Sequence, residues 1–333
     1  MNPLLVPTLS LFATVSIGLL MVRKAAVWGL VDLPNERKVH TQPTPRTGGL
    51  AMIIGIGSVY ALMRAIGWVP TSSIPWQSWL SGIGFIFVGA LDDHFGFHPR
   101  QKISVFLGLS VIAAWPWAHI VTTTGFVWIP PTWVGSRTLF ITSTVLLTLW
   151  FMAVTNSVNI EDAINGYMGG FTFITLAALY VRGVDSSITL GALLGFLILN
   201  WPKAKHFMGD AGSFGCGFII AESILRGGGL AQPSIALALT APISIDVAVG
   251  LLRRIRLGMS PLAPDQSTCP HHLLKLFRGS IFITTLALWF NAFLFGFLMK
   301  WSHAVITQAI LYTALLFYLN RHSFTTGRLK NNI

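Results

Sequence analysis

The sequence predicts an all-α integral membrane protein that forms a single domain, 1–333. Hydrophobic residues make up 53% of the 333 residues, whereas charged residues make up only 10%. Apolar runs of about 20 residues, the length that crosses the hydrocarbon core of a bilayer, recur from one end of the chain to the other. Basic residues gather in alternate connections between these runs, as they do on the cytoplasmic side of membrane proteins. Together these three observations define the fold class.

The apolar runs predict about eleven transmembrane helices, with ten as the alternative because several runs are short. The expected spans are 4–22, 48–66, 78–91, 103–121, 138–155, 168–182, 188–201, 214–226, 234–252, 280–299 and 302–320. The first run is as apolar as a signal peptide, but no small-residue cleavage site follows it. We therefore interpret it as a retained span.

The basic residues predict the orientation, with the N-terminus in the periplasm of a bacterial inner membrane. The cytoplasmic connections are then 23–47, 92–102, 156–167, 202–213, 253–279 and the tail from 321. All but five of the 22 Lys and Arg residues fall in them, the exceptions being Arg64, Arg137, Arg182, Arg226 and Lys300. The net charge of +11 is thus explained by topology and by contact with anionic membrane lipids. Nucleic acid is excluded as a partner, because it would require a soluble basic domain.

Cysteine usage points to neither a disulfide nor a thiolate metal site. Cys216 falls in an expected span and Cys269 in a cytoplasmic connection, and no CxxC pattern is present.

The acidic residues are unevenly placed, which indicates a functional site. Of the 11 acids, all except Asp185 and Glu222 fall on the predicted cytoplasmic side, although the positive-inside rule does not govern acids. A carboxylate in a lipid-embedded protein is costly and usually functional. Asp246 lies deeper in its span, and we expect Arg253 or Arg254 to pair with it. The pattern predicts a divalent cation and an anionic substrate at one membrane surface.

The first candidate motif is Leu91-Asp92-Asp93-His94, which Lys102 follows closely. Two adjacent carboxylates remain ionised only beside a cation or a basic group. Mg²⁺ prefers oxygen ligands together with water and phosphate. A solvated turn with ordinary charges is the alternative.

The second motif spans 156–166 and carries Asn156, Asn159, Asp162 and Asn165, which recur every three residues. In a helix, consecutive members of such a series are neighbours. They are candidates for metal ligands and for hydrogen bonds to a nucleotide. Helix capping is the alternative, since Asn and Asp favour helix ends.

The third motif is Phe207-Met208-Gly209-Asp210-Ala211-Gly212-Ser213, directly before an apolar run. The glycines let the backbone approach a ligand, and the free N–H groups of a helix N-terminus suit phosphate. A plain glycine-rich turn is the alternative.

Two further connections supply basic groups. In 253–279, His271 and His272 are expected to contact phosphate or sugar, and zinc is disfavoured because no thiolate pattern accompanies them. In 23–47, Arg37, Lys38, His40 and Arg46 are placed to neutralise phosphate in an ordered, non-helical segment. Anchoring to the inner leaflet is the alternative there.

In this order, the motifs resemble those of the polyprenyl-phosphate N-acetylhexosamine-1-phosphate transferases, the MraY-type and WecA-type enzymes, and are closer to the WecA type. The resemblance runs from about Val31 to His272. The matching elements are DLPNERKVH with PTPRTGG, LDDHFG with RQK, NSVNIEDAING, FMGDAGS, and RRIRLGMSP before a His pair. Two departures stand out: the family's N-x-x-N-x-x-D-G-x-D-G has Ala163 and Asn165 here, and H-x-H-H begins with Cys269.

This resemblance implies a phosphotransferase reaction and roles for the candidate residues. A sugar-1-phosphate would pass from a UDP-N-acetylhexosamine to undecaprenyl phosphate, with UMP as the second product and Mg²⁺ or Mn²⁺ as the cofactor. The implied catalytic residues are Asp92, Asp93, Asp162 and Asp210; the implied metal ligands are Asp210, Asp162 and Asp93; the implied substrate-binding residues are Arg46, Lys102, Asn156, Asn159, Asn165, His271 and His272.

Several alternatives stay open at this point. The donor is expected to be UDP-GlcNAc, with UDP-GalNAc or a UDP-6-deoxy-N-acetylhexosamine (QuiNAc or FucNAc) as alternatives, and the product would start O-antigen or another envelope polysaccharide. An ion-coupled secondary transporter is the non-enzyme alternative, but transporter sites lie near the bilayer midplane, often within inverted repeats. A channel would need a ring of acids along a pore. A homodimer is left open.

Overall fold

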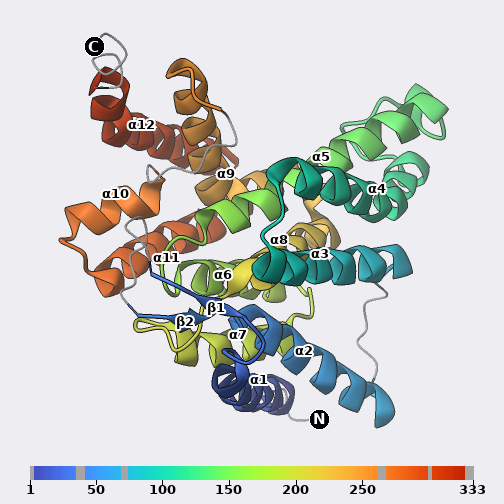
Figure 1. Ribbon diagram of the computed structural model, residues 1–333. Helices are drawn as coiled ribbons and strands as arrows, with labels where there is room; N and C mark the ends of the chain where they lie inside the picture. The colour runs from blue at the N-terminus through green and yellow to red at the C-terminus, as the bar shows by residue number, and fades with distance from the viewer. Residues whose placement is uncertain (1–3, 35–41, 69–73, 261–267, 299–301, 327–333) are drawn as a thin grey trace.

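The protein is a bundle of helices with one small pair of strands (Figure 1). The computed structural model describes residues 4–34, 42–68, 74–260, 268–298 and 302–326. The helices are α1 (Leu5–Lys24), α2 (Gly48–Ala65), α3 (Trp76–Phe95), α4 (Pro99–Thr124), α5 (Arg137–Glu161), α6 (Tyr167–Tyr180), α7 (Ser187–Asn200), α8 (Gly209–Ile224), α9 (Pro233–Arg256), α10 (Cys269–Leu276), α11 (Ile281–Leu298) and α12 (Ser302–Thr326). Short 3₁₀ and π segments, η1 (Pro131–Trp133) and η2 (Leu225–Gly229), precede α5 and follow α8.

The expected spans all coincide with helices, so the all-α prediction is confirmed. Six helices are long and apolar enough to cross a membrane, namely α1, α2, α4, α5, α9 and α11. Shorter apolar helices are α6, α7 and the stretch 303–319 within α12. The chain is therefore a multi-pass membrane protein, and the count of eleven spans stays a prediction.

Helix α8 lies at the centre of the bundle and is buried over most of its length. It packs against α2, α3, α5 and α6, and Figure 1 shows it between these helices. Small residues permit this close packing, as they do between membrane helices in general. At Gly89 of α3, an added Cβ would lie 2.6 Å from the carbonyl oxygen of Asp210. The backbones of α3 and α8 therefore touch next to the Asp92-Asp93 pair.

The outer helices pack pairwise around this centre and present apolar side chains outward. Helix α1 packs on α7 and α2, α4 packs on α5, and α9 packs on α5, α11 and α12. Large exposed apolar side chains lie on several of them, including Phe12, Ile83, Phe87, Phe290 and Phe293. Such a surface would be a liability in water, whereas hydrocarbon solvates it.

Several helices extend into connections that the sequence analysis treats as loops, among them α3 and α5. Helix α3 continues to Phe95 and ends at Gly96, whose φ is +66°. Helix α5 continues to Glu161. As a result Asp92, Asp93, Asn156 and Asn159 lie on the last turns of helices, which corrects the loop boundaries expected at 92 and 156. In addition, α10 forms inside the connection 253–279.

The first connection contains a two-stranded antiparallel pair, β1 (Val31–Asp32) and β2 (Thr44–Pro45), in which Val31 lies opposite Pro45. The described residues of this segment, 31–34 and 42–47, are non-helical, as the sequence predicts, whereas 35–41 lie outside the described residues. The segment is tied to the connection before α8, because Phe207 donates its backbone N–H to Pro45 O and Gly48 donates to Phe207 O. The strand pair therefore places Arg46 close to the start of α8.

Candidate active site

Most of the candidate residues line a cavity of about 340 Å³, within the size range of small-molecule sites. Its walls come from β1, the end of α3, the end of α5, the residues around the start of α8, and α10. The lining residues are Asp32, Arg46, Asp93, Asn159, Asp162, Ala163, Ile164, Asn165, Asn200, Phe207, Met208, Gly209, Asp210, His271 and Ile281. Separate segments therefore deliver their carboxylates to one place, as the sequence analysis predicts.

Asp210 lies in the first turn of α8, directly after Gly209. Gly209 has a φ of +70°, which favours glycine, and an added Cβ would lie 2.7 Å from Asp93 Oδ2. The Asp210 carboxylate is held from two sides. Asn159 Nδ2 donates to its Oδ1 at 3.1 Å, and Lys102 Nζ lies 3.6 Å from its Oδ2.

Asp93 reaches across from α3 to the start of α8. Its Oδ2 accepts a hydrogen bond from Ala211 N at 3.1 Å, and the N–H of Asp210 also donates to this carboxylate. These amides are not free, so the expectation that α8 offers free N–H groups to a phosphate is wrong for them. The carboxylate takes the place of an external anion at a helix N-terminus.

Asp92 points to the other side of the same helix end and does not line the cavity. Its Oδ2 accepts from Lys102 Nζ at 2.6 Å, and its Oδ1 accepts from Phe97 N at 2.6 Å. Lys102 therefore lies between Asp92 and Asp210. The adjacent acids have different partners, a difference that the sequence alone does not predict.

The asparagine series splits between two environments. Asn159 faces α8 and donates to Ser213 Oγ at 2.8 Å as well as to Asp210. Asn156 Nδ2 instead donates to Met152 O of its own helix at 2.7 Å, and it is absent from the cavity wall. Asp162 and Asn165 follow the end of α5, and Asn165 Nδ2 donates to Pro202 O at 3.2 Å. The three-residue spacing thus predicts neighbours only as far as the helix continues.

The basic candidates on the cavity wall are Arg46 and His271. The Arg46 guanidinium pairs with Asp32, and its Nη1 lies 3.9 Å from Asp93 Oδ1. His271 Nδ1 is hydrogen-bonded to Thr268 Oγ1 at 2.8 Å, whereas His272 does not line the cavity. Glu36, Arg37, Lys38, His40 and Asp265 lie outside the described residues.

Burial and mutual repulsion shift the pKa values of Asp93, Asp162 and Asp210, three of the four carboxyls in the cavity wall. These three lie beyond the apolar parts of their helices. Burial raises the pKa of Asp93 to about 6, although backbone N–H groups and Arg46 oppose this. Burial, with the nearby Asp93 charge, raises the pKa of Asp162 to about 7. Burial, with the Asp92 side chain and the Asp93 charge, raises the pKa of Asp210 to about 8.

Asp92 behaves differently, since the hydrogen bonds from Asp210 and Lys102 outweigh its burial and lower its pKa. The Asp92 and Asp210 side chains are hydrogen-bonded to each other, and their pKa values are displaced in opposite directions.

A hard divalent cation fits this donor set. Asp93, Asp162 and Asp210 offer carboxylate oxygens, and burial raises the pKa of each of them, an effect that a bound cation would oppose. Within the described residues, no three acid, histidine or cysteine side chains form a closed metal cluster. Mg²⁺ does not require one, because it keeps waters and phosphate oxygens beside one or two carboxylates.

Two polar residues of the cavity wall were not among the sequence candidates, Asp32 and Asn200. Asn200 Oδ1 accepts from Gly166 N at 2.6 Å, and its Nδ2 donates to His206 O at 2.9 Å. It therefore ties the segment after α5 to the segment before α8. The signal that identifies Asp210 was also present here, since Asn200 is a polar residue at the end of an apolar run.

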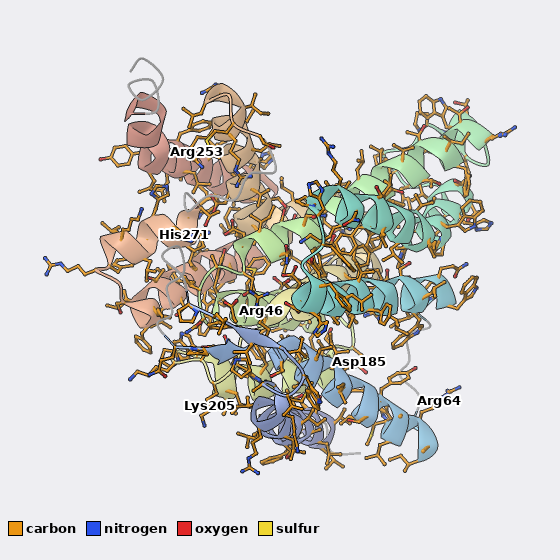
Figure 2. The ribbon with its side chains drawn as sticks, in the orientation of Figure 1. Arg46, Arg64, Asp185, Lys205, Arg253 and His271 are labelled. Atoms are coloured by element: carbon orange, nitrogen blue, oxygen red, sulfur yellow. The ribbon has the colours of Figure 1, made fainter. Side chains whose placement is uncertain are left out.

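Figure 2 shows that the predicted topology separates two ends of the molecule. Arg46, Lys205, Arg253 and His271, all from connections predicted to be cytoplasmic, lie in the left half of the view. Arg64 and Asp185, from connections predicted to lie on the other side, are in the right half. The cavity is at the end that carries Arg46 and His271.

Comparison with known proteins gives one family match and several similar chains. The family model described as "Glycosyl transferase family 4" matches residues 76–228. A decaprenyl-phosphate N-acetylglucosaminephosphotransferase of Mycolicibacterium smegmatis is 33% identical, over 80% of this chain and 72% of the relative. A probable undecaprenyl-phosphate N-acetylglucosaminyl 1-phosphate transferase of Bacillus subtilis is 29% identical, over 92% and 85%. The undecaprenyl-phosphate alpha-N-acetylglucosaminyl 1-phosphate transferase of Escherichia coli K12 is 29% identical, over 95% and 90%.

Proposed function

The chain belongs to the family of polyprenyl-phosphate N-acetylglucosamine-1-phosphate transferases and is a phosphotransferase enzyme, and from this premise we propose that it transfers N-acetylglucosamine-1-phosphate from UDP-GlcNAc to undecaprenyl phosphate. The products are undecaprenyl-diphosphate-GlcNAc and UMP, and the lipid product starts an envelope polysaccharide such as O-antigen. The names of the relatives from B. subtilis and E. coli support N-acetylglucosamine 1-phosphate as the transferred group and undecaprenyl phosphate as the lipid.

The observation that carries the proposal is the cavity in which Asp93, Asp162 and Asp210 meet Arg46 and His271. A site of this composition suits a substrate that is itself highly anionic, provided that a cation is shared between them. The concentration of basic residues in alternate connections supports a cytoplasmic orientation for this end. Both substrates are then available at the inner leaflet of the bacterial inner membrane.

The reaction requires charge neutralisation and positioning more than proton abstraction. A phosphate monoester has a second pKa near ~6, so the lipid phosphate is mostly a dianion at neutral pH and is already nucleophilic. Its oxygen attacks the phosphorus that carries the sugar. The bond from that phosphorus to the bridging oxygen breaks, and UMP leaves with this oxygen and its electron pair. The obstacle is the repulsion between two anions.

Asp210, Asp162 and Asp93 are the residues that would hold Mg²⁺ or Mn²⁺. When bound, the ion supplies charge neutralisation of the diphosphate and polarisation of its phosphorus. Asn159 orients Asp210 through the hydrogen bond at 3.1 Å. Lys102 is held between Asp92 and Asp210, where its ammonium group offsets phosphate charge beside the cavity. Arg46 and His271, which both line the cavity, contact phosphate or sugar.

The experiment is a UMP-release assay on purified protein with UDP-GlcNAc, undecaprenyl phosphate and a Mg²⁺ titration, with the lipid product identified by mass spectrometry. Asp210→Asn should reduce turnover by at least about 10²-fold. Asp185→Asn is the control, because Asp185 caps the start of α7 through Ser187 N at the other end of the molecule. Turnover by Asp210→Asn within a few-fold of wild type would contradict the metal assignment.

A donor panel tests the sugar. Ala163 and Asn165, the two departures from the family motif, both lie in the cavity wall. UDP-GlcNAc is therefore compared with UDP-GalNAc and a UDP-6-deoxy-N-acetylhexosamine at equal concentration. A higher kcat/KM for either alternative would replace UDP-GlcNAc in the proposal and leave the reaction class unchanged.

A further inference from the structure

A buried acid outside the cavity, Asp246, contacts residues at the end of α5 and at the start of α10, two elements that contribute to the cavity wall. It is on α9 and only 1% exposed. Its Oδ2 accepts a hydrogen bond from Cys269 N at 2.6 Å, and Cys269 is the first residue of α10. The Glu161 carboxyl lies beside that of Asp246, and Glu161 is the last residue of α5, directly before Asp162. The Asp246 carboxylate thus joins the end of one wall-forming helix to the start of another.

Helix α10 needs such an anchor. It has only eight residues, and a helix of that length is unstable without outside contacts. Its first turn has few other donors to satisfy, because Pro270 has no N–H and His271 N and His272 N bond to Thr268 O. Cys269 N therefore offers the point at which a carboxylate from another helix holds this turn, with favourable interaction with the helix dipole.

The consequence reaches the cavity through His271, two residues after the anchored amide. The imidazole is oriented by Thr268 Oγ1 at 2.8 Å, and it forms part of the cavity wall. Thr268 precedes the same anchored residue, so the placement of both side chains depends on where α10 begins. Figure 1 shows α10 beside α11 at the edge of the bundle, away from the centre around α8.

We propose that Asp246 is a positioning residue, which holds the first turn of α10 so that His271 faces the cavity. The catalytic consequence rests on the proposed function, whereas the anchoring itself does not. Asp246 touches no substrate in this scheme and acts through His271. The two parts require separate measurements.

The anchoring is tested by the reactivity of Cys269, which is 1% exposed. The chain has two cysteines, so Cys216→Ala leaves Cys269 as the single thiol. In that background, Asp246→Ala should raise the maleimide labelling rate about 10-fold or more, since a hydrogen bond to a charged group is lost. Asp246→Asn keeps an acceptor oxygen and should label at close to the parent rate. Unchanged labelling of a folded Asp246→Ala protein would overturn the proposal.

Glu222→Ala is the matched control. Glu222 is also a buried acid that joins two helices, since its Oε2 accepts from Trp117 Nε1 at 2.9 Å. It lies on α8 and has no part in the α10 anchor, so Cys269 labelling should stay at the parent rate. An increase equal to that of Asp246→Ala would overturn the proposal, because the effect would then be general loosening. If Asp246→Ala does not insert, Asp246→Ser is used, whose shorter side chain should give the same labelling increase.

The catalytic consequence is tested by a double-mutant cycle on kcat/KM. Asp246→Ala should lower kcat/KM by about 10–10²-fold, the scale for a misplaced catalytic group, and Asp246→Asn should restore most of it. In a His271→Ala background, Asp246→Ala should cause no further loss of kcat/KM, because both changes remove the same contact. Losses that multiply in the double variant would overturn the positioning role. If the wild-type protein releases no UMP, the proposed function fails, and the labelling experiment still decides the anchoring.

Discussion

Gly209→Ala is the substitution whose effect follows most directly from the geometry of the site. Gly209 adopts a φ of +70°, and a Cβ there would lie 2.7 Å from Asp93 Oδ2 and 3.0 Å from Arg46 O. Asp93 cannot move freely, because its side chain is only 1% exposed and accepts a hydrogen bond from Ala211 N. The substitution therefore forces a displacement between the start of α8 and the end of α3.

The size of the effect can be worked from these distances. Ordinary van der Waals contact begins at 3.4 Å, so the groups must separate by about 0.7 Å. A misplacement of about 1 Å in a catalytic site costs on the order of 10²-fold in rate, which is about 2.7 kcal/mol in activation free energy. The left-handed backbone adds about 1–2 kcal/mol of folding cost for an alanine. The expected loss of activity is thus far larger than the loss of folding stability alone would cause.

The assay separates these two contributions by comparing Gly209→Ala with Gly135→Ala. Gly135 has a φ of +76°, and a Cβ there would meet nothing within 4 Å. Both variants should lose similar thermal stability in detergent, but only Gly209→Ala should lose about 10²-fold in kcat/KM for UMP release. Equal kcat/KM values for the two variants would refute the reasoning, since backbone strain alone would then account for the loss.

Two further outcomes follow from single residues. Asn159→Ala should lower kcat/KM by about 10-fold or more, because Asp210 loses an orienting hydrogen bond. Asn156→Ala should change kcat/KM little, since the Asn156 side chain is bonded to Met152 O. Equal losses in the two variants would contradict this distinction. His206 is fully buried, and burial lowers its pKa to about 4. Below the ordinary pKa of 6.5, the unfolded chain binds more protons at His206 than the folded chain does. The contribution of the neutral imidazole to the free energy of unfolding is therefore complete above pH 6.5 and declines as the pH falls toward 4, by about 2 kcal/mol at pH 5. Thermal unfolding at pH 7 and pH 5 should show that His206→Gln lacks this decline, and an unchanged pH dependence would speak against the burial of a neutral imidazole.

Much of the site was predictable because lipid makes polar residues conspicuous. Asp93, Asp162 and Asp210 stand out at the ends of apolar runs, and all three line the cavity. The same signal also marked Asp92 and Asn156, whose side chains are directed to Lys102 and Met152 O instead. Position along the chain therefore locates the membrane surface but does not determine the direction in which a side chain points.

The sequence by itself determined the helical membrane fold, the connections that carry chemistry and the family, because hydrophobic length, charge asymmetry and motif order are one-dimensional properties. Only the tertiary structure decided which of two adjacent aspartates faces the cavity, that Asp93 occupies N–H groups at the start of α8, and that Asp246 holds α10. These depend on how helices distant in sequence approach one another. That approach is decided by packing at positions such as Gly89, where two backbones touch, and no local pattern encodes it.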